Sequence, residues 1–129
     1  MRIFAVTLLA LAFFILAGAG LLKAQGPEDL LRQGRGIYHD TCAQCHRASG
    51  QGLPGTFPAL DKNPFVVGDP GPVIATVLNG LKGKLGQMPA WKDKLSDREI
   101  AGVLTYIRQA WSNQAPAVTP AMVAPLRGK

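Results

Sequence analysis

Cys42-Ala43-Gln44-Cys45-His46 is the stretch that decides the fold of this chain. The spacing C-x-x-C-H is typical of c-type haem attachment, because two thiols three residues apart on one helical turn can add to the two vinyl groups of one porphyrin. The histidine that follows reaches the iron from the same side. The stretch therefore predicts one covalent haem c, bound through Cys42 and Cys45, with His46 as an axial ligand of the iron.

The cysteine pair has two other interpretations. A thioredoxin-like redox pair needs strands around the motif, whereas glycines, prolines and helical patterns surround it here. Half of a zinc site needs further ligands, and the only other histidine of the chain is His39. We interpret His39 as a surface side chain, and the context of the motif favours the haem.

Composition limits the chain to a small domain. With 129 residues and an apolar N-terminal segment, it has room for one domain of about a hundred residues. A buried porphyrin would add apolar surface to so small a core. Both cysteines belong to the motif, so no structural disulfide is available. The formal net charge is +6, but the cations are scattered and no nucleic-acid-binding motif accompanies them, so nucleic acid is not an expected partner.

Residues 1–24 have the features of an export signal. Met1-Arg2 precedes an uncharged apolar run from Ile3 to Leu22, and Ala17-Gly18-Ala19 fits the A-x-A cleavage pattern. The run is also long enough to span about 30 Å of hydrocarbon as an uncleaved helix. A cleaved signal peptide and a retained membrane anchor therefore both stay open. Either one would place the rest of the chain on the periplasmic side of the cytoplasmic membrane, soluble or anchored.

Residues 25–112 are expected to form an all-α domain of three to five helices around the haem. Pro27 followed by two acidic residues predicts a helix from about Glu28 to Tyr38. A second helix ends at Asn79-Gly80, and Ser96-Asp97-Arg98-Glu99 is a capping box that begins a third. The apolar residues expected on the buried faces of these last two helices are Val73, Ile74, Val77, Leu78, Ile100, Val103, Leu104, Ile107 and Trp111.

Two stretches are expected to be irregular. Arg47 to Gly68 is rich in Gly and Pro and should wrap the porphyrin edge as a loop. The second ring nitrogen of an axial histidine needs an acceptor, commonly a backbone carbonyl. We assign that acceptor to the carbonyl of Pro58, with the carbonyl of Pro54 as the alternative. Residues 113–129 contain three prolines and are expected to form an irregular tail, lying on the domain or hanging free.

Met88 is the candidate for the second axial ligand. It lies forty-two residues after His46, on a stretch rich in Gly and Pro that is expected to be a loop. A thioether is a soft ligand, and a His/Met pair raises the reduction potential of a haem. The other two methionines are Met1 in the N-terminal segment and Met122 in the Pro-rich tail, so neither competes with Met88.

These residues together resemble class I c-type cytochromes. In that family the first and last helices cross at a glycine and an aromatic residue, which implies that Gly34 and Tyr38 meet Val103 and Tyr106. The ending from Ile107 to Thr119 is similar to cytochrome c domains of bacterial respiratory complexes and membrane dehydrogenase cytochrome subunits. The residues that carry the resemblance are Gly34, Tyr38, Cys42, Cys45, His46, the loop Gly55 to Leu60, Met88-Pro89, Val103 and Tyr106.

The resemblance implies an electron carrier of a bacterial respiratory or photosynthetic chain, not an enzyme. The iron would cycle between Fe(III) and Fe(II) without changing its ligands. One alternative is a cytochrome subunit of a membrane oxidoreductase complex. The other is a haem enzyme with a labile sixth ligand, against which Met88 argues. Tyr38 and Trp91 are expected to support the haem pocket.

Four lysines bracket Met88, and in class I cytochromes the haem edge on the methionine side is exposed. A basic ring there would steer the protein onto a redox partner with an acidic face, such as an oxidase, a quinol-oxidising complex or a dehydrogenase. Arg127 and Lys129 lie in the tail and are not expected to contribute. The four docking residues are Lys82, Lys84, Lys92 and Lys94.

Overall fold

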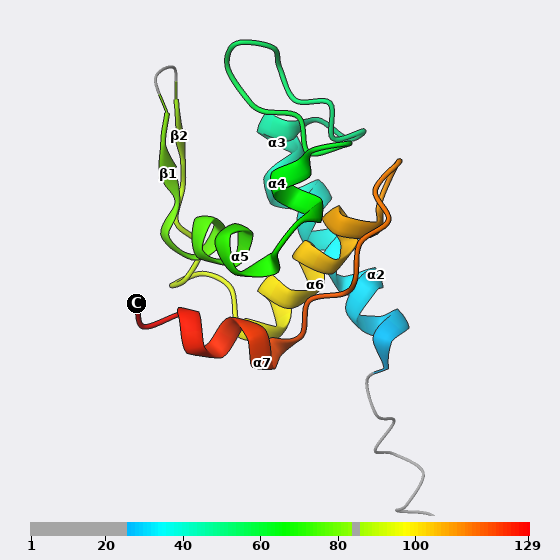
Figure 1. Cartoon of the computed structure of the whole chain (residues 1–129), viewed down its shortest axis with the longest axis vertical. Helices are drawn as coiled ribbons and strands as arrows, with labels where there is room; N and C mark the ends of the chain where they lie inside the picture. Colours follow the sequence, from blue (N-terminus) through cyan, green and yellow to red (C-terminus); the bar gives the residue numbers. More distant parts are fainter. Residues whose placement is uncertain (1–25, 84–85) are drawn as a thin grey trace, which may run out of the picture.

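The computed structural model describes residues 26–83 and 86–129, and within these residues the fold is mostly helical, as predicted (Figure 1). The predictions for residues 1–24 and for Lys84 lie outside this part of the chain. None of the helices in the described ranges combines the length and the apolar character needed to cross a membrane. The elements are α2 (Pro27–Ile37), the π-helical turn η1 (Tyr38–Cys42), α3 (Ala43–His46), α4 (Pro64–Val67), α5 (Pro70–Asn79), β1 (Leu81–Lys82), β2 (Gln87–Met88), α6 (Asp97–Gln109), α7 (Pro120–Val123) and the 3₁₀ turn η2 (Ala124–Leu126).

Helices α2 and α6 cross where each carries a glycine. A Cβ atom on Gly34 would lie 1.9 Å from the carbonyl oxygen of Gly102 and 2.7 Å from the amide nitrogen of Val103. Only a residue without a side chain permits this approach. One turn further along, the rings of Tyr38 and Tyr106 lie 5.3 Å apart. The helix crossing expected from the resemblance is therefore confirmed.

The capping box that begins α6 is also confirmed. The Ser96 hydroxyl accepts a bond from the Glu99 amide, and the Glu99 carboxylate accepts one from the Ser96 amide. The helix ends at Gln109, so Trp111, which was expected on its buried face, follows it in a turn with φ +57°. Except for Tyr106, every residue from position 100 to 108 is buried, so α6 is the central helix of the domain.

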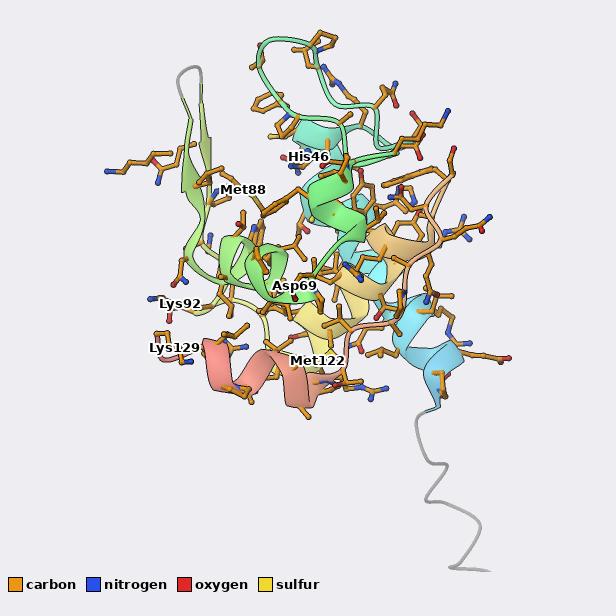
Figure 2. The ribbon with its side chains drawn as sticks, viewed as in Figure 1. His46, Asp69, Met88, Lys92, Met122 and Lys129 are labelled. Atoms are coloured by element: carbon orange, nitrogen blue, oxygen red, sulfur yellow. The ribbon has the colours of Figure 1, made fainter. Side chains whose placement is uncertain are left out.

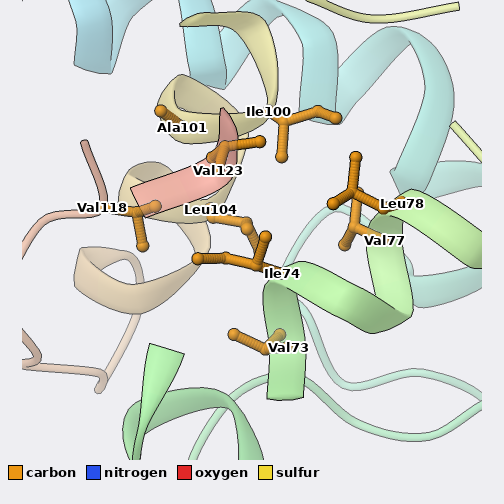
Figure 3. Packing of buried hydrophobic residues seen from close by; sticks show 9 residues of the cluster. All are labelled: Val73, Ile74, Val77, Leu78, Ile100, Ala101, Leu104, Val118 and Val123. Carbon is orange, nitrogen blue, oxygen red and sulfur yellow. The ribbon is translucent and has the colours of Figure 1, made fainter. Parts of the chain in front are cut away.

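The larger core cluster packs α5 against one side of α6 and the C-terminal segment against another (Figure 3). Because buried residues recur along α5 at helical spacing, that helix covers α6 with a continuous apolar face. The members of the cluster are Val73, Ile74, Val77, Leu78, Ile100, Ala101, Leu104, Val118 and Val123.

The segment 113–129, expected to be an irregular tail lying on the domain or hanging free, lies on the domain; residues 113–119 are irregular, but α7 and η2 follow them. Val118 and Val123 are completely buried in the core, and the chain between them begins helix α7 at Pro120. Proline suits this first helical position because its fixed φ matches the helix. The Thr105 hydroxyl donates to the carbonyl of Val118 and accepts from its amide. The C-terminal segment is therefore part of the domain, and the prolines in it mark turns and a helix start.

The loop expected at residues 47–68 and the loop expected around Met88 also contain ordered elements. Helix α4 lies within 47–68, and Leu53 and Phe57 form a β-bridge that closes the loop upon itself. Met88 lies in β2 of a two-stranded hairpin and not in a loop. In Figure 1 the loop, α4 and the hairpin border the same region of the molecule, above α5 and α6.

Candidate haem site

The C-x-x-C-H motif lies where α2 passes through the π-helical turn into α3. Single π-helical turns inside helices are frequent at functional sites, because they redirect side chains without ending the helix. Both cysteines are free and half-buried, and burial raises the pKa of the Cys42 thiol. Within residues 26–83 and 86–129 no three His, Cys, Asp or Glu side chains gather as metal ligands would, so nothing there supports the zinc interpretation.

The His46 ring is buried and held by one hydrogen bond. Its Nδ1 lies 2.9 Å from the carbonyl oxygen of Pro58, the contact that sequence analysis assigned. A carbonyl can only accept, so Nδ1 carries the proton and Nε2 presents its lone pair. The ring is therefore in the tautomer that a metal ligand needs, and the hydrogen bond raises its basicity. Ligation of iron by His46 stays a prediction.

The position of the Pro58 carbonyl depends on a glycine. Gly52 has φ +66°, and a Cβ atom there would lie 2.4 Å from the carbonyl oxygen of Phe57 and 2.6 Å from that of Pro58. The Gly52 amide also donates to the carbonyl of His46. The two arms of the loop therefore approach each other directly beside the ring.

The base of this loop is tied to the residues after α6. The amides of Leu60 and Asp61 both donate to the carbonyl of Gly50. The Asn113 side chain accepts from the amide of Lys62 and donates to the carbonyls of Leu60 and Ile107. Asn113 is buried, and sequence reasoning missed it because a single asparagine beside a proline-rich segment carries no pattern.

Tyr38 supports the motif through the backbone. It is completely buried, and its hydroxyl donates to the carbonyl of Arg47, 2.6 Å away and one residue after His46. Burial, with smaller contributions from Cys42 and Tyr106, raises its pKa far above the usual range, so the hydroxyl stays a donor. Whether Tyr38 also contacts the haem stays a prediction.

Met88 lies across from His46, on the hairpin (Figure 2). Its strand pairs with β1 so that Leu81 faces Met88, and the side chain is half-buried against the larger core cluster. A Cβ atom on Gly80 would lie 2.5 Å from the carbonyl oxygen of Met88, so the hairpin begins at a close backbone contact. The backbone at Met88 is therefore held by its pairing with Leu81 and by the close approach of Gly80.

Trp91 and three of the four predicted docking lysines lie around the methionine strand. Trp91 is half-buried against the same core cluster, and its amide donates to the carbonyl of Val77 in α5. Lys82, Lys92 and Lys94 are exposed. The Lys94 ammonium lies 5.3 Å from the centre of the Trp91 ring, a cation–π contact that restrains it.

These residues fit a c-type haem. Two unbonded thiols and a buried imidazole with a fixed tautomer lie on one helical segment, and a thioether lies across from them. Three large apolar side chains are exposed on the loop, α4 and β1, the elements that border this region: Leu53, Phe65 and Leu81. A porphyrin is a ligand that would cover such surface.

Comparison with known proteins agrees with this fit. Residues 29–107 match the family described as cytochrome c oxidase, cbb3-type, subunit III. The chain is 37% identical over 115 residues to the gluconate 2-dehydrogenase cytochrome c subunit of Pantoea cypripedii, covering 81% of this chain and 26% of that protein. It is 34% identical over 97 residues to the cytochrome c subunit of a quinone-dependent alcohol dehydrogenase of Gluconobacter oxydans, covering 68% of this chain and 20% of that protein.

A third relative is of more similar length. Cytochrome c-552 of Thermus thermophilus is 34% identical over 115 residues, covering 80% of this chain and 71% of that protein. The chain spans only about a quarter or a fifth of the two dehydrogenase subunits that it matches. The matched region includes both cysteines and the histidine of the motif. The chain therefore belongs to this cytochrome c family and is an electron-transfer protein with covalently bound haem c.

Proposed function

We propose that His46 and Met88 are the two axial ligands of the haem iron, and that the chain carries single electrons between redox partners at the periplasmic face of a bacterial membrane. The observation that carries this proposal is the pairing of a fixed imidazole with a half-buried thioether across the same region. Residues 1–24 would export the chain, as a cleaved signal or as an anchor. N-terminal sequencing of the mature protein distinguishes the two.

Each residue has a separate task in this proposal. The bound haem supplies the Fe(III)/Fe(II) couple. The two cysteines would hold the cofactor, and the Pro58 carbonyl orients His46 and increases its basicity. Met88 would occupy the remaining position and keep small substrates away from the iron. A site with both positions filled by protein suits a carrier, and we therefore propose that the chain is not itself an enzyme.

Substitution of Met88 tests the ligand assignment. Met88→Ala should keep the haem attached, because Met88 takes no part in the thioether bonds, but should lose the thioether-to-iron charge-transfer band and lower the reduction potential. Met122→Ala is the matched control, since Met122 is exposed on α7. Absorption spectra and a redox titration measure both effects. A Met88→Ala protein with the wild-type oxidised spectrum and potential would show that Met88 is not the ligand.

We further propose that the partner has an acidic face and docks beside the methionine strand. Lys82 is exposed on β1, paired with Gln87, and Lys92 and Lys94 are exposed after Trp91. Attraction between these lysines and an acidic partner accelerates the encounter of the two proteins, and it weakens as salt screens the charges. Lys82→Glu should therefore slow electron transfer to an anionic oxidant, hexacyanoferrate(III), several-fold at low salt.

The control for this test is Lys62→Glu, an equal charge change on an exposed lysine of the loop on the histidine side. The potential should change little in both variants, because both lysines are exposed and solvent and salt screen their charges. Equal rates for Lys82→Glu and Lys62→Glu at every salt concentration would argue against steering at this face. A partner bound through apolar contacts would then be favoured.

A second candidate is a cytochrome subunit of a membrane oxidoreductase complex. The similarity to two dehydrogenase cytochrome c subunits favours it. Solubilisation of native membranes, followed by size separation and detection of the haem, tests it. Migration of the haem with a dehydrogenase or an oxidase supports the complex, whereas migration as a small protein supports the free carrier.

A further inference from the structure

We propose that the C-terminal segment 118–127 is a positioning element for the Met88 ligand. Arg127 fastens the turn that follows the methionine strand to the start of α6, and so increases the free energy needed to release the thioether from iron. This inference rests on the proposed role of Met88 as a ligand. It assigns a function to a part of the chain whose sequence resembles an unstructured tail.

The Arg127 guanidinium makes three contacts. Its Nε lies 2.7 Å from Oδ1 of Asp97, the first residue of α6. Its Nη2 donates to the carbonyl of Leu95 at 2.9 Å, and its Nη1 donates to the carbonyl of Lys92. One side chain therefore joins the C-terminal segment, the turn at residues 91–95 and the N-terminus of α6. Figure 2 shows the C-terminal end of the chain beside Lys92.

The turn held by Arg127 is coupled to Met88 over a short distance in the chain. The amides of Trp91 and Lys92 donate to the carbonyls of Val77 and Leu78 in α5, and only Pro89 and Ala90 separate Met88 from Trp91. Proline has few backbone conformations, so a displacement of the turn is transmitted to the strand. Fixing the turn thus restricts the positions that the Met88 thioether can take.

The two segments also share one core. Met88, Trp91, Leu95 and Leu126 all pack as half-buried residues against the larger core cluster, and Val118 and Val123 belong to it. Leu126 precedes Arg127, so apolar packing and hydrogen bonding act at the same place. The C-terminal segment and the methionine strand therefore pack against the same core cluster.

The effect should be confined to the methionine side. The loop that holds His46 is tied to the opposite end of α6 by Asn113, without any contact from Arg127. Local opening of a protein breaks only the contacts that hold the segment that opens. Loss of the Arg127 contacts should accordingly ease release of Met88 and leave the His46 side unchanged.

The experiment measures binding of imidazole to the oxidised holoprotein, because imidazole must displace the sixth ligand. Arg127→Ala should raise the affinity of the oxidised holoprotein for imidazole about tenfold. A change of this size is expected from the loss of one charged hydrogen bond that stabilises the state with Met88 bound to iron. Arg127→Lys keeps the charge near Asp97 but cannot reach both carbonyls, and should fall between Arg127→Ala and wild type. Arg32→Ala, which removes an exposed pair with Asp29 in α2, should resemble wild type.

Asn113→Ala separates local release from global instability. It should lower the denaturant midpoint without the rise in imidazole affinity. Wild-type imidazole affinity in Arg127→Ala, together with a normal thioether-to-iron band in wild type, would overturn this inference and leave the proposed function intact. Absence of that band from the wild-type protein would overturn both. Equal gains in imidazole affinity for Arg127→Ala and Asn113→Ala would also overturn the inference about Arg127, because the gain would then follow the global stability of the fold alone.

Discussion

Gly34→Ala should be strongly destabilising, although alanine is the better helix former. The added Cβ would lie 1.9 Å from the Gly102 carbonyl oxygen, about 1.5 Å short of the 3.4 Å at which ordinary contact begins. All three of the nearest atoms belong to the backbone of α6, so no side chain can rotate away. The helices must separate at their crossing, and we expect a loss of about 3 kcal/mol, the upper part of the range for overpacking.

Gly36→Ala is the control, because it lies two residues further along the same helix and a Cβ there has nothing within 4 Å. It should raise stability by about 1 kcal/mol through helix propensity alone. Guanidinium unfolding of both holoproteins, followed by helical circular dichroism, measures the difference. If the two variants differ by less than about 1 kcal/mol, α2 and α6 do not cross as closely as described.

Two further predictions concern the His46 hydrogen bond and the cap of α6. Gly52→Ala should displace the Pro58 carbonyl from His46 and raise the reduction potential in a redox titration, because a less basic imidazole stabilises Fe(III) less. Gly55→Ala, also at positive φ but in open space, should leave the potential unchanged. The Ser96 amide and hydroxyl hold the pKa of Glu99 below its usual 4.5. The cap therefore stabilises the fold above about pH 4.5, and this contribution is lost as the pH falls through the lowered value. Thermal unfolding should show a wild-type advantage over Glu99→Gln that shrinks in acid.

The helical parts of the fold could be predicted because local signals and the apolar pattern agree there. The capping box at Ser96 and Glu99 is a local hydrogen-bond pattern, and the apolar residues of α5 recur at helical spacing. The Pro58 carbonyl could be assigned because an axial histidine needs an acceptor, commonly a backbone carbonyl, and the Gly- and Pro-rich loop directly follows the motif.

The C-terminal segment could not be predicted because its order comes from long-range contacts. Nothing near Val118 in the sequence shows that the Thr105 hydroxyl will bond to it. Arg108 is a similar case. Its buried guanidinium donates to the carbonyls of Val66, Gly68 and Pro116, although a basic residue near a helix end usually indicates a solvated face. Backbone acceptors that meet only in the folded chain leave no motif.

Helix α6 sets the separation of the two proposed ligands. Its N-terminal residue Asp97 binds the guanidinium that holds the methionine turn. Beyond its other end, Asn113 and Trp111 hold the loop around His46, since the Trp111 indole donates to the carbonyl of Ala48.

The middle of α6 lies against Gly34 in the helix that leads to the cysteine motif. All three parts that would hold the haem are thus fixed to one buried helix, and a packed interior yields little to small forces. A carrier needs this property, because electron transfer is slowed by any movement of the ligands between the two oxidation states. A change in α6 that tilts one end should therefore alter the potential even where both ligands remain bound.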